Sequence, residues 1–266
     1  MIDYKNICLS VCELVRETGN FILKEKETLS NEGIEAKSSN NFVTYIDKAS
    51  EERLVKGLKL LLPDSGFIAE EGTETYRSDK YNWIIDPIDG TTNFIHGFPP
   101  FAISIGLIEG ETLVMGVIYE IVNQECFYAW KDSKAYLNGI EIKVSGRDTV
   151  AQSLIAIGFP YNAQNRMEGF FESLKYLYSR SHGFRRLGSA ATDLAYVACG
   201  RCEAFFEYNL SPWDVAAGAF IVQQAGGRVS DFNFGNNYIF GREIIATNGY
   251  IHDEFSTIVH QFLANK

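Results

Sequence analysis

The first 62 residues contain two stretches in which apolar side chains recur at helical spacing. Residues 2 to about 27 and residues 47 to 62 each place apolar positions on one face and charges on the other, which predicts two amphipathic helices. The second helix is expected to end at Pro63, because proline cannot continue a helix. Residues 29–41 between them are polar and rich in Ser, Asn and Glu, and we expect a mobile loop there.

The pattern changes to that of strands after the second helix. Two short apolar runs, Phe67–Ala69 and Tyr81–Ile85, each lead into acidic residues and are expected to form buried strands. Four further runs are joined by turn-forming pairs such as Asn138-Gly139. They predict an antiparallel meander with strands at 102–108, 113–119, 125–130 and 135–137.

Beyond about residue 150, short strand patterns alternate with helical patterns. Strands are expected at 154–157, 183–186, 204–207, 229–230 and 244–246, and helices at 165–179, 189–199, 212–225 and 250–263. This order indicates an α+β half followed by an α/β half. We place the two halves at 1–148 and 149–266 and expect them to form one compact structural unit.

The net charge of −10 and the sequence pI of about 5.0 argue against nucleic-acid binding. A duplex-binding protein needs a basic face to displace counterions, and the sequence contains no basic block. We also expect no membrane insertion, because no apolar run reaches the ~18 residues of a spanning helix. The five cysteines are odd in number, and the N-terminus lacks the apolar core of a signal peptide. Both features favour the reducing cytoplasm.

Carboxylate residues gather next to the predicted strand and helix ends. They are Asp47, the pair Glu70-Glu71, the pair Asp86 and Asp89, and Asp214. Carboxylate oxygens are the natural ligands of hard cations such as Mg²⁺, so these positions are candidates for a metal site. A single acid at a strand end carries no such meaning, because loops contain many of them.

The segment from Asp86 to Thr92 carries the most specific pattern. Asp86 follows a fully apolar strand, at the edge where open α/β sheets place ligands, and Asp89 stands three residues later. In a helix-like turn the two carboxylates can share one cation or two adjacent ones. The run Gly90-Thr91-Thr92 then opens a short helix whose free backbone N–H groups suit a phosphate. A simple Asp-capped turn explains one aspartate but not both.

A second candidate lies at the start of the helix expected at 212–225. Ser211 is a good N-cap, Pro212 suits the first helical position, and Asp214 occupies the third. Asp214 is therefore either a capping-box acid or a metal ligand, and the local pattern alone leaves both open. The small residues at 216–219 would let this helix pack closely against a neighbour and hold such a ligand rigidly.

Four segments, taken together, resemble the inositol monophosphatase family. Trp83–Phe94 is similar to the first signature of the family, Trp213–Gly218 to its second, Ala225–Gly227 to the run that follows, and Ala69–Gly72 to the acidic turn before the first signature. The likeness extends from Lys37 almost to the C-terminus. It implies a layered αβαβα sandwich, with an antiparallel sheet in the N-terminal half and a mixed sheet in the C-terminal half.

The resemblance also implies two to three Mg²⁺ ions per subunit. Glu70, Asp86 and the backbone carbonyl of Ile88 would hold the first ion. Asp86, Asp89 and Asp214 would hold the second, and Glu70 would help to hold a third, largely hydrated one.

The same resemblance assigns roles in catalysis and in substrate binding. Thr91, paired with Asp47, would orient the attacking water, with Glu70 as the third catalytic residue. The implied substrate-binding positions are Gly90, Thr91, Thr92, Gly188, Ser189, Ala190, Glu207 and Asp214. Nearby loop positions are Lys37, Glu71 and Arg186, of which Lys37 is equally well interpreted as a surface lysine.

The favoured function is Mg²⁺-dependent hydrolysis of a small phosphate monoester, most simply myo-inositol 1-phosphate, by direct in-line attack of water. Histidinol-phosphatase, fructose-1,6-bisphosphatase and 3′-phosphoadenosine nucleotide phosphatase remain alternatives of the same fold. A regulatory protein that keeps the metal site and acts through partners is an alternative of another class. A homodimer and inhibition by lithium follow from the resemblance alone.

Two positions depart from the family pattern: Asn41 stands where many members have Asp, and Ser211 where the animal enzymes have His.

Overall fold

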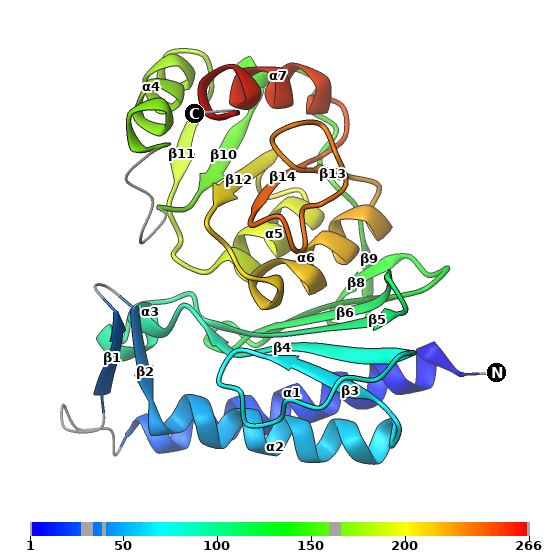
Figure 1. Cartoon of the computed structure of the whole chain (residues 1–266). Helices are drawn as coiled ribbons and strands as arrows, with labels where there is room; N and C mark the ends of the chain where they lie inside the picture. Colours follow the sequence, from blue (N-terminus) through cyan, green and yellow to red (C-terminus); the bar gives the residue numbers. More distant parts are fainter. Residues whose placement is uncertain (1, 28–33, 39–40, 160–165, 265–266) are drawn as a thin grey trace.

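Helices α1 (Tyr4–Lys26) and α2 (Tyr45–Leu61) form the outer layer of the N-terminal half in this computed structural model, which describes residues 2–27, 34–38, 41–159 and 166–264 (Figure 1). The buried face of α1 includes Val11, Val15 and Ile22, at the spacing that the sequence pattern predicts. Together with Leu54 and Leu58 of α2, these side chains pack against the first sheet in one apolar cluster.

The first sheet has seven strands in the order β3-β4-β5-β6-β7-β8-β9. Neighbouring strands from β4 onward are antiparallel, which confirms the predicted meander. The edge strand β3 runs parallel to β4, so the sheet is mixed, whereas we expected it to be antiparallel throughout. The strands are β3 (Gly66–Ala69), β4 (Tyr81–Asp89), β5 (Ala102–Glu109), β6 (Thr112–Glu120), β7 (Glu125–Trp130), β8 (Ala135–Leu137) and β9 (Ile140–Ile142).

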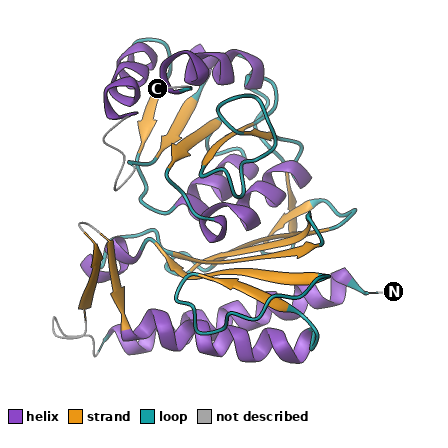
Figure 2. Ribbon diagram, in the orientation of Figure 1, coloured by secondary structure: helices purple, strands orange, loops and turns teal. Residues whose placement is uncertain are grey.

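The central helical layer consists of α5 (Ala190–Ala198) and α6 (Pro212–Gln224), which cover the other face of this sheet (Figures 1 and 2). Gly106 and Gly116 pair across β5 and β6 directly beneath α6. A Cβ on Gly116 would overlap the backbone carbonyl of Ala217, so only glycine permits this close approach. The small residues of α6 therefore allow the tight packing that the sequence predicts.

The second sheet and its outer helices complete the layered sandwich. Its five strands lie in the order β11-β10-β12-β14-β13, with parallel and antiparallel neighbours. Helices α4 and α7 cover its outer face around a third apolar cluster. The elements are η2 (Val150–Gln152), β10 (Leu154–Ile157), α4 (Met167–Tyr178), β11 (Gly183–Arg185), β12 (Ala204–Tyr208), β13 (Arg228–Ser230), β14 (Glu243–Thr247) and α7 (His252–Leu263). The layered fold class is thus confirmed.

The expected loop at 29–41 is wrong in part. Ile34–Ser38 (β1) and Asn41–Thr44 (β2) pair as an antiparallel hairpin, while residues 28–33 and 39–40 lie outside the described residues. This segment is too polar to show a strand pattern, and its two strands pair with each other through their backbones. Lys37 belongs to β1, and its side chain is outside the described part of the structure.

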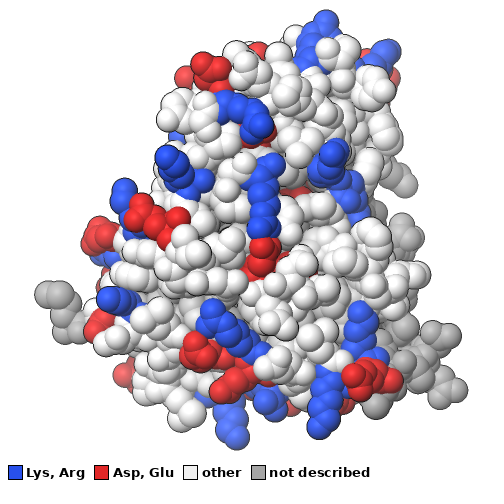
Figure 3. Space-filling model, turned by 180° about the vertical axis from the view of Figure 1, so that it is seen from behind, with Lys and Arg blue, Asp and Glu red and all other residues white. Residues whose placement is uncertain are grey.

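The surface carries charged side chains of both signs. On the face drawn in Figure 3, Lys and Arg side chains are interspersed with Asp and Glu rather than gathered into one stripe. Among the described residues, every helix is too short or too polar to cross a membrane.

Candidate metal centre and active site

The end of β4 presents two aspartates to one pocket. Every residue of β4 is buried, and its pairing with β5 shifts register between Asp86 and Asp89. The shift lets Pro87 and Ile88 bulge out of the ladder, and the amide of Ile88 donates to Oδ1 of Asp86 at 2.9 Å. We expected a helix-like turn at this point. The segment is instead irregular strand, because β5 continues to pair with it as far as Asp89.

The third aspartate comes from the start of α6. The amide of Ser211 donates to Oδ2 of Asp214 at 2.7 Å, so Asp214 does close a capping box. The hydroxyl of Ser104 on β5 donates to the carbonyl of Trp213 at 3.0 Å, which ties this helix start to the first sheet. Asp86, Asp89 and Asp214 each offer one oxygen, and the three oxygens lie within 4.8 Å of one another. The two interpretations of Asp214 are therefore compatible.

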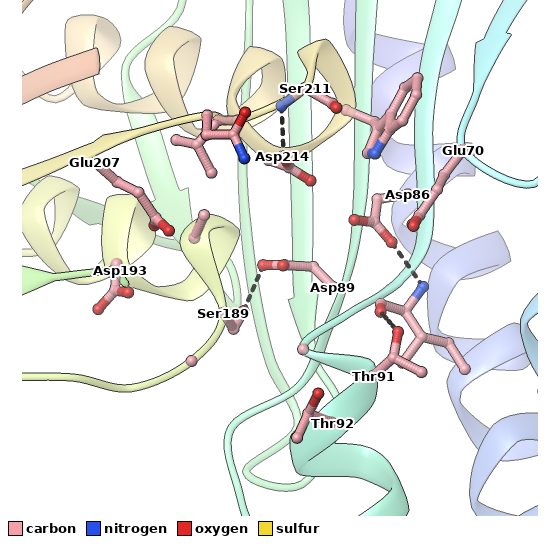
Figure 4. A pocket seen from close by; sticks show the side chains of 18 of the residues that line it. Glu70, Asp86, Asp89, Thr91, Thr92, Ser189, Asp193, Glu207, Ser211 and Asp214 are labelled. Atoms are coloured by element: carbon pink, nitrogen blue, oxygen red, sulfur yellow. Dashed lines mark hydrogen bonds between the residues drawn. The ribbon is translucent and has the colours of Figure 1, made fainter. Parts of the chain in front are cut away.

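Glu70 reaches the same place from the neighbouring strand. It follows β3, which runs parallel to β4, so its position and that of Asp86 share one edge of the sheet. The amide of Glu70 donates to the carbonyl of Ile85 at 3.1 Å. Figure 4 shows the carboxyl groups of Glu70 and Asp86 turned toward each other, and their charges interact.

The pKa values of the three clustered aspartates are raised. Burial raises the pKa of Asp86 well above its usual range, and the carboxylates of Glu70, Asp89 and Asp214 raise it further. Burial raises the pKa of Asp89 to about 6, although hydrogen bonds from Ser189 and Ala191 lower it. Burial and the neighbouring carboxylates also raise the pKa of Asp214. Such a cluster favours an added cation, and its donor set of hard oxygens fits Mg²⁺.

A hydroxyl and a carboxylate stand next to this cluster. Oγ1 of Thr91 lies 3.0 Å from the carbonyl oxygen of Ile88 and 3.3 Å from Oδ1 of Asp47. The other oxygen of Asp47 accepts from the amide and the hydroxyl of Thr44 at 2.8 and 2.6 Å. Asp47 is therefore held firmly at the start of α2, with one oxygen directed at Thr91.

The turn into α3 (Thr91–His96) is shaped by Gly90. This residue has φ of 89°, which favours glycine, and a Cβ on it would meet the carbonyl oxygen of Gly188 at 3.0 Å. The side-chain amide of Asn93 donates to the carbonyls of Pro100 and Leu187 at 2.8 and 2.7 Å. These contacts join the metal turn to the segment that leads into α5.

Asp89 links the two halves of the chain. Its Oδ2 accepts from the hydroxyl of Ser189 at 2.6 Å and from the amide of Ala191 at 2.7 Å (Figure 4). Both donors belong to the start of α5, where Ser189 is the N-cap. The Ser189 hydroxyl thus orients a candidate metal ligand, in addition to the substrate role that the resemblance implies for this turn.

A cavity of about 220 Å³ gathers most of the expected positions. Those that line it are Glu70, Asp86, Ile88, Asp89, Gly90, Thr91, Thr92, Arg186, Gly188, Ser189, Ala190, Glu207 and Asp214. Asp47 stands behind Thr91. Glu71 does not line the cavity, and its amide instead donates to the buried Glu51 at 2.8 Å.

The sequence reasoning missed part of the cavity wall. The lining residues that were not expected as site residues are Gly158, Asp193, Asn209, Leu210, Ser211, Trp213 and Arg242. A signal existed for Asp193, because it is the only charged residue in the mostly apolar stretch Ala190–Ala198. An acid on a helix that must be buried requires a local reason. Arg242 carried no such signal, since it lies in a polar connection far along the chain.

Comparisons with known proteins agree with this geometry. The model of the inositol monophosphatase family matches residues 3–263. Nus factor SuhB of Escherichia coli strain K12 is 42% identical over 235 residues, which are 88% of each chain. The solved structure of extragenic suppressor protein suhB from Bartonella henselae is 34% identical, with a TM-score of 0.91 over 96% of this chain and 98% of that one. Inositol monophosphatase from Anabaena is also 34% identical, with a TM-score of 0.87 over 97% and 96% of the two chains. The chain belongs to the inositol monophosphatase family.

Proposed function

We propose that this protein hydrolyses a small phosphate monoester with the help of Mg²⁺. The observation that carries the proposal is the meeting of Asp86, Asp89 and Asp214, whose oxygens lie within 4.8 Å of one another on one wall of a pocket. Bound Mg²⁺ would neutralise the charge of the phosphate and lower the pKa of a coordinated water. Burial raises the pKa of Asp89 to about 6, and a bound cation would favour the ionised form of this carboxyl group.

The ligands divide naturally between two adjacent positions. Glu70, Asp86 and the carbonyl of Ile88 would hold one ion, and Asp86, Asp89 and Asp214 a second, with Glu70 also supporting a third. The rigid supports of these groups are the hydrogen bonds from the amides of Ile88, Ala191 and Ser211. Such outer contacts orient ligands and raise the affinity for the metal.

The attacking water would be oriented by Thr91 and Asp47. Oγ1 of Thr91 is 3.3 Å from Oδ1 of Asp47, so the hydroxyl can donate a hydrogen bond to that carboxylate while its oxygen accepts one from water. Amides at Gly90 and Thr91 would contact the phosphate opposite the leaving group. Attack would be direct and in line, and the cysteines, all free thiols, take no part.

The leaving alcohol would face the turn Gly188–Ala190 and Glu207 on the far wall. We propose myo-inositol 1-phosphate as the first substrate to test, supported by the 34% identical Anabaena relative that is named an inositol monophosphatase. Histidinol phosphate, fructose 1,6-bisphosphate and 3′-phosphoadenosine 5′-phosphate remain alternatives. A homodimer in the cytoplasm and inhibition by lithium complete the proposal, and light scattering and a lithium titration test the oligomer and the inhibition.

The decisive experiment is phosphate release from these four substrates, with and without Mg²⁺, by the wild-type protein and by Asp89→Asn. The variant should lose turnover while its thermal unfolding stays cooperative, because asparagine can still accept from Ser189 and Ala191. Release of no phosphate from any substrate, or full turnover by the variant, would contradict the proposal.

A second candidate function is regulatory, because the 42% identical Escherichia coli relative carries the name Nus factor SuhB. We propose that any such role acts through partner proteins and without direct nucleic-acid binding, in line with the net charge of −10. Replacing the native gene by the Asp89→Asn form separates the two functions. A host that grows poorly without the gene but normally with this form needs the protein but not its turnover.

A further inference from the structure

Glu51 is a buried acid of α2 that does not line the pocket and that the proposed chemistry does not use. Its side chain is 0% exposed, and both carboxyl oxygens accept hydrogen bonds from the segment that follows β3. Oε2 accepts from the amide of Glu71 at 2.8 Å. Oε1 accepts from the amide and the hydroxyl of Thr73 at 2.8 and 2.7 Å. Three donors from one short segment therefore converge on this carboxyl group.

The segment that Glu51 binds begins directly after Glu70, whose carboxyl group is turned toward Asp86 (Figure 4). On its β4 side, the backbone of Glu70 is tied to the sheet, because its amide donates to the carbonyl of Ile85 at 3.1 Å. After Glu70 the chain leaves the strand and turns at Gly72, which has φ of 67°. A Cβ on Gly72 would meet nothing within 4 Å, so packing around that residue does not hold the turn. The hydrogen bonds to Glu51 do.

The same helix carries the acid that contacts Thr91. Asp47 and Glu51 are four residues apart, so they lie on one face of α2, and both are buried. Oδ1 of Asp47 lies 3.3 Å from Oγ1 of Thr91. One turn of α2 thus contacts the Thr91 side of the site through Asp47 and the Glu70 side through Glu51. A shift of the turn relative to α2 would move Glu70 relative to both Thr91 and the aspartate cluster.

We propose that Glu51 is a positioning residue, which holds Glu70 in place for Mg²⁺ through its hydrogen bonds to Glu71 and Thr73. This inference rests on the magnesium-dependent function proposed above, in which Glu70 is a ligand. Contacts outside the ligand shell that orient a ligand commonly change metal affinity by about 10- to 100-fold. The effect should be confined to the ions that Glu70 holds, because Glu51 has no hydrogen bond to the aspartate cluster.

The test is a calorimetric titration of Mg²⁺ into the wild-type protein and into Glu51→Gln, without substrate. Glutamine keeps the shape of the side chain, but its NH₂ group donates and leaves at least one N–H of the turn without an acceptor. One Mg²⁺ binding step should weaken about 10-fold, while the step that depends on the aspartate cluster stays at the wild-type value. The Mg²⁺ concentration for half-maximal phosphate release should rise by the same factor, and kcat at saturating Mg²⁺ should stay close to the wild-type value.

A second variant decides the matter if Glu51→Gln does not fold. Thr73 is exposed, and Thr73→Val removes only the hydroxyl that donates to Glu51. It should weaken the same Mg²⁺ binding step about 2- to 5-fold, which corresponds to the loss of one hydrogen bond.

A matched control separates positioning from stability. Glu203 is also fully buried, but its carboxylate accepts from Arg147 and from the amide of Leu154 outside the pocket. Glu203→Gln should lower the thermal midpoint and leave every Mg²⁺ binding step unchanged.

The outcomes distinguish this inference from the proposed function. Unchanged Mg²⁺ affinity in both Glu51→Gln and Thr73→Val, or an equal weakening by Glu203→Gln, would overturn the positioning role while the phosphatase proposal stands. Selective weakening of one step in a protein that releases no phosphate would support the positioning role and contradict hydrolysis alone. A wild-type protein that binds no Mg²⁺ would refute both.

Discussion

Two helices of this protein begin in nearly the same way and end up with different tasks. Helix α2 starts after Thr44, and helix α6 starts after Ser211, each with an aspartate at the third helical position. In both, the aspartate accepts from the amide of the N-cap residue, at 2.8 Å for Asp47 and 2.7 Å for Asp214. Locally they are the same capping device.

The difference lies in what meets the second oxygen. In Asp47 one oxygen accepts from the amide and hydroxyl of Thr44, and the other meets the hydroxyl of Thr91. In Asp214 one oxygen accepts from the amide of Ser211, and the carboxylate also lies close to Asp86 and Asp89. A capping acid thus becomes a candidate metal ligand only where other carboxylates converge on it. The comparison teaches that one local motif can serve catalysis in two distinct ways.

The largest effect is expected when the charge of Asp214 is removed. Asp214→Asn can still accept from Ser211, so the helix start should survive, but a ligand is lost. Turnover should fall at least about 1000-fold, because loss of a contact outside the ligand shell already costs 10- to 100-fold. A Mg²⁺ titration of phosphate release, with thermal unfolding as the control, measures this. A variant with unchanged Mg²⁺ requirement and turnover would place Asp214 among ordinary capping residues.

A smaller and different effect is expected for Asp47→Asn. The variant should lose about 100-fold in kcat, in the lower range of general-base contributions. Its Mg²⁺ concentration for half-maximal activity should stay at the wild-type value, since Asp47 contacts Thr91 rather than the aspartate cluster. The paired Mg²⁺ titrations of the two variants sharpen the comparison. A large rise in the Mg²⁺ requirement of Asp47→Asn would mean that both capping acids bind metal.

The position of α6 on the sheet can be disturbed without substituting any acidic residue. Gly116→Ala would push a Cβ into the carbonyl of Ala217, which should cost about 1–3 kcal/mol of unfolding free energy. Activity should fall as well, because α6 carries Asp214. Gly146→Ala is the matched control: it is exposed and its Cβ would meet nothing within 4 Å. Denaturant unfolding of both variants measures the difference, and equal stabilities would show that α6 does not depend on this close approach.

The smallest effect concerns a third helix start, which carries a histidine at its first position in addition to the acids Asp253 and Glu254. His252 opens α7, is buried, and lies 3.0 Å from the hydroxyl of Thr247. Burial, and then the charge of Arg228, lowers the pKa of His252 to about 4.

The sign of the resulting pH dependence follows directly. Because the folded pKa lies below the unfolded value of about 6.5, the unfolded chain binds more protons between these values. The contribution to stability is complete above pH 6.5 and is lost as pH falls toward 4. Acidification from pH 7 to 5 should lower the thermal midpoint of the wild type more than that of His252→Gln, by about 2–4 °C. Identical slopes for the two proteins would contradict this role of His252.

The sequence by itself was enough for much of the architecture. Helical periodicity predicted α1, α2 and α6, and alternating turn signals predicted the meander from β5 to β8, because these elements each bury one regular apolar face. The hairpin β1–β2 was missed for the opposite reason, since it is held by backbone pairing in a polar segment. The direction of β3 was missed too, because a four-residue strand contains no information about its neighbour.

The same distinction between sequence and tertiary structure applies to the candidate site. The sequence determined which acids are available, and the turn chemistry around Gly90 and Ser211 determined how each is presented locally. Only the tertiary structure decided that Asp214 stands beside Asp86 and Asp89, because that meeting depends on glycines of β5 and β6 that let α6 approach the sheet. It also decided that Asp193 lines the pocket, where its Oδ1 has no hydrogen-bond partner among the described residues. Contacts between residues about a hundred positions apart arise from packing, and packing is a property of the whole chain.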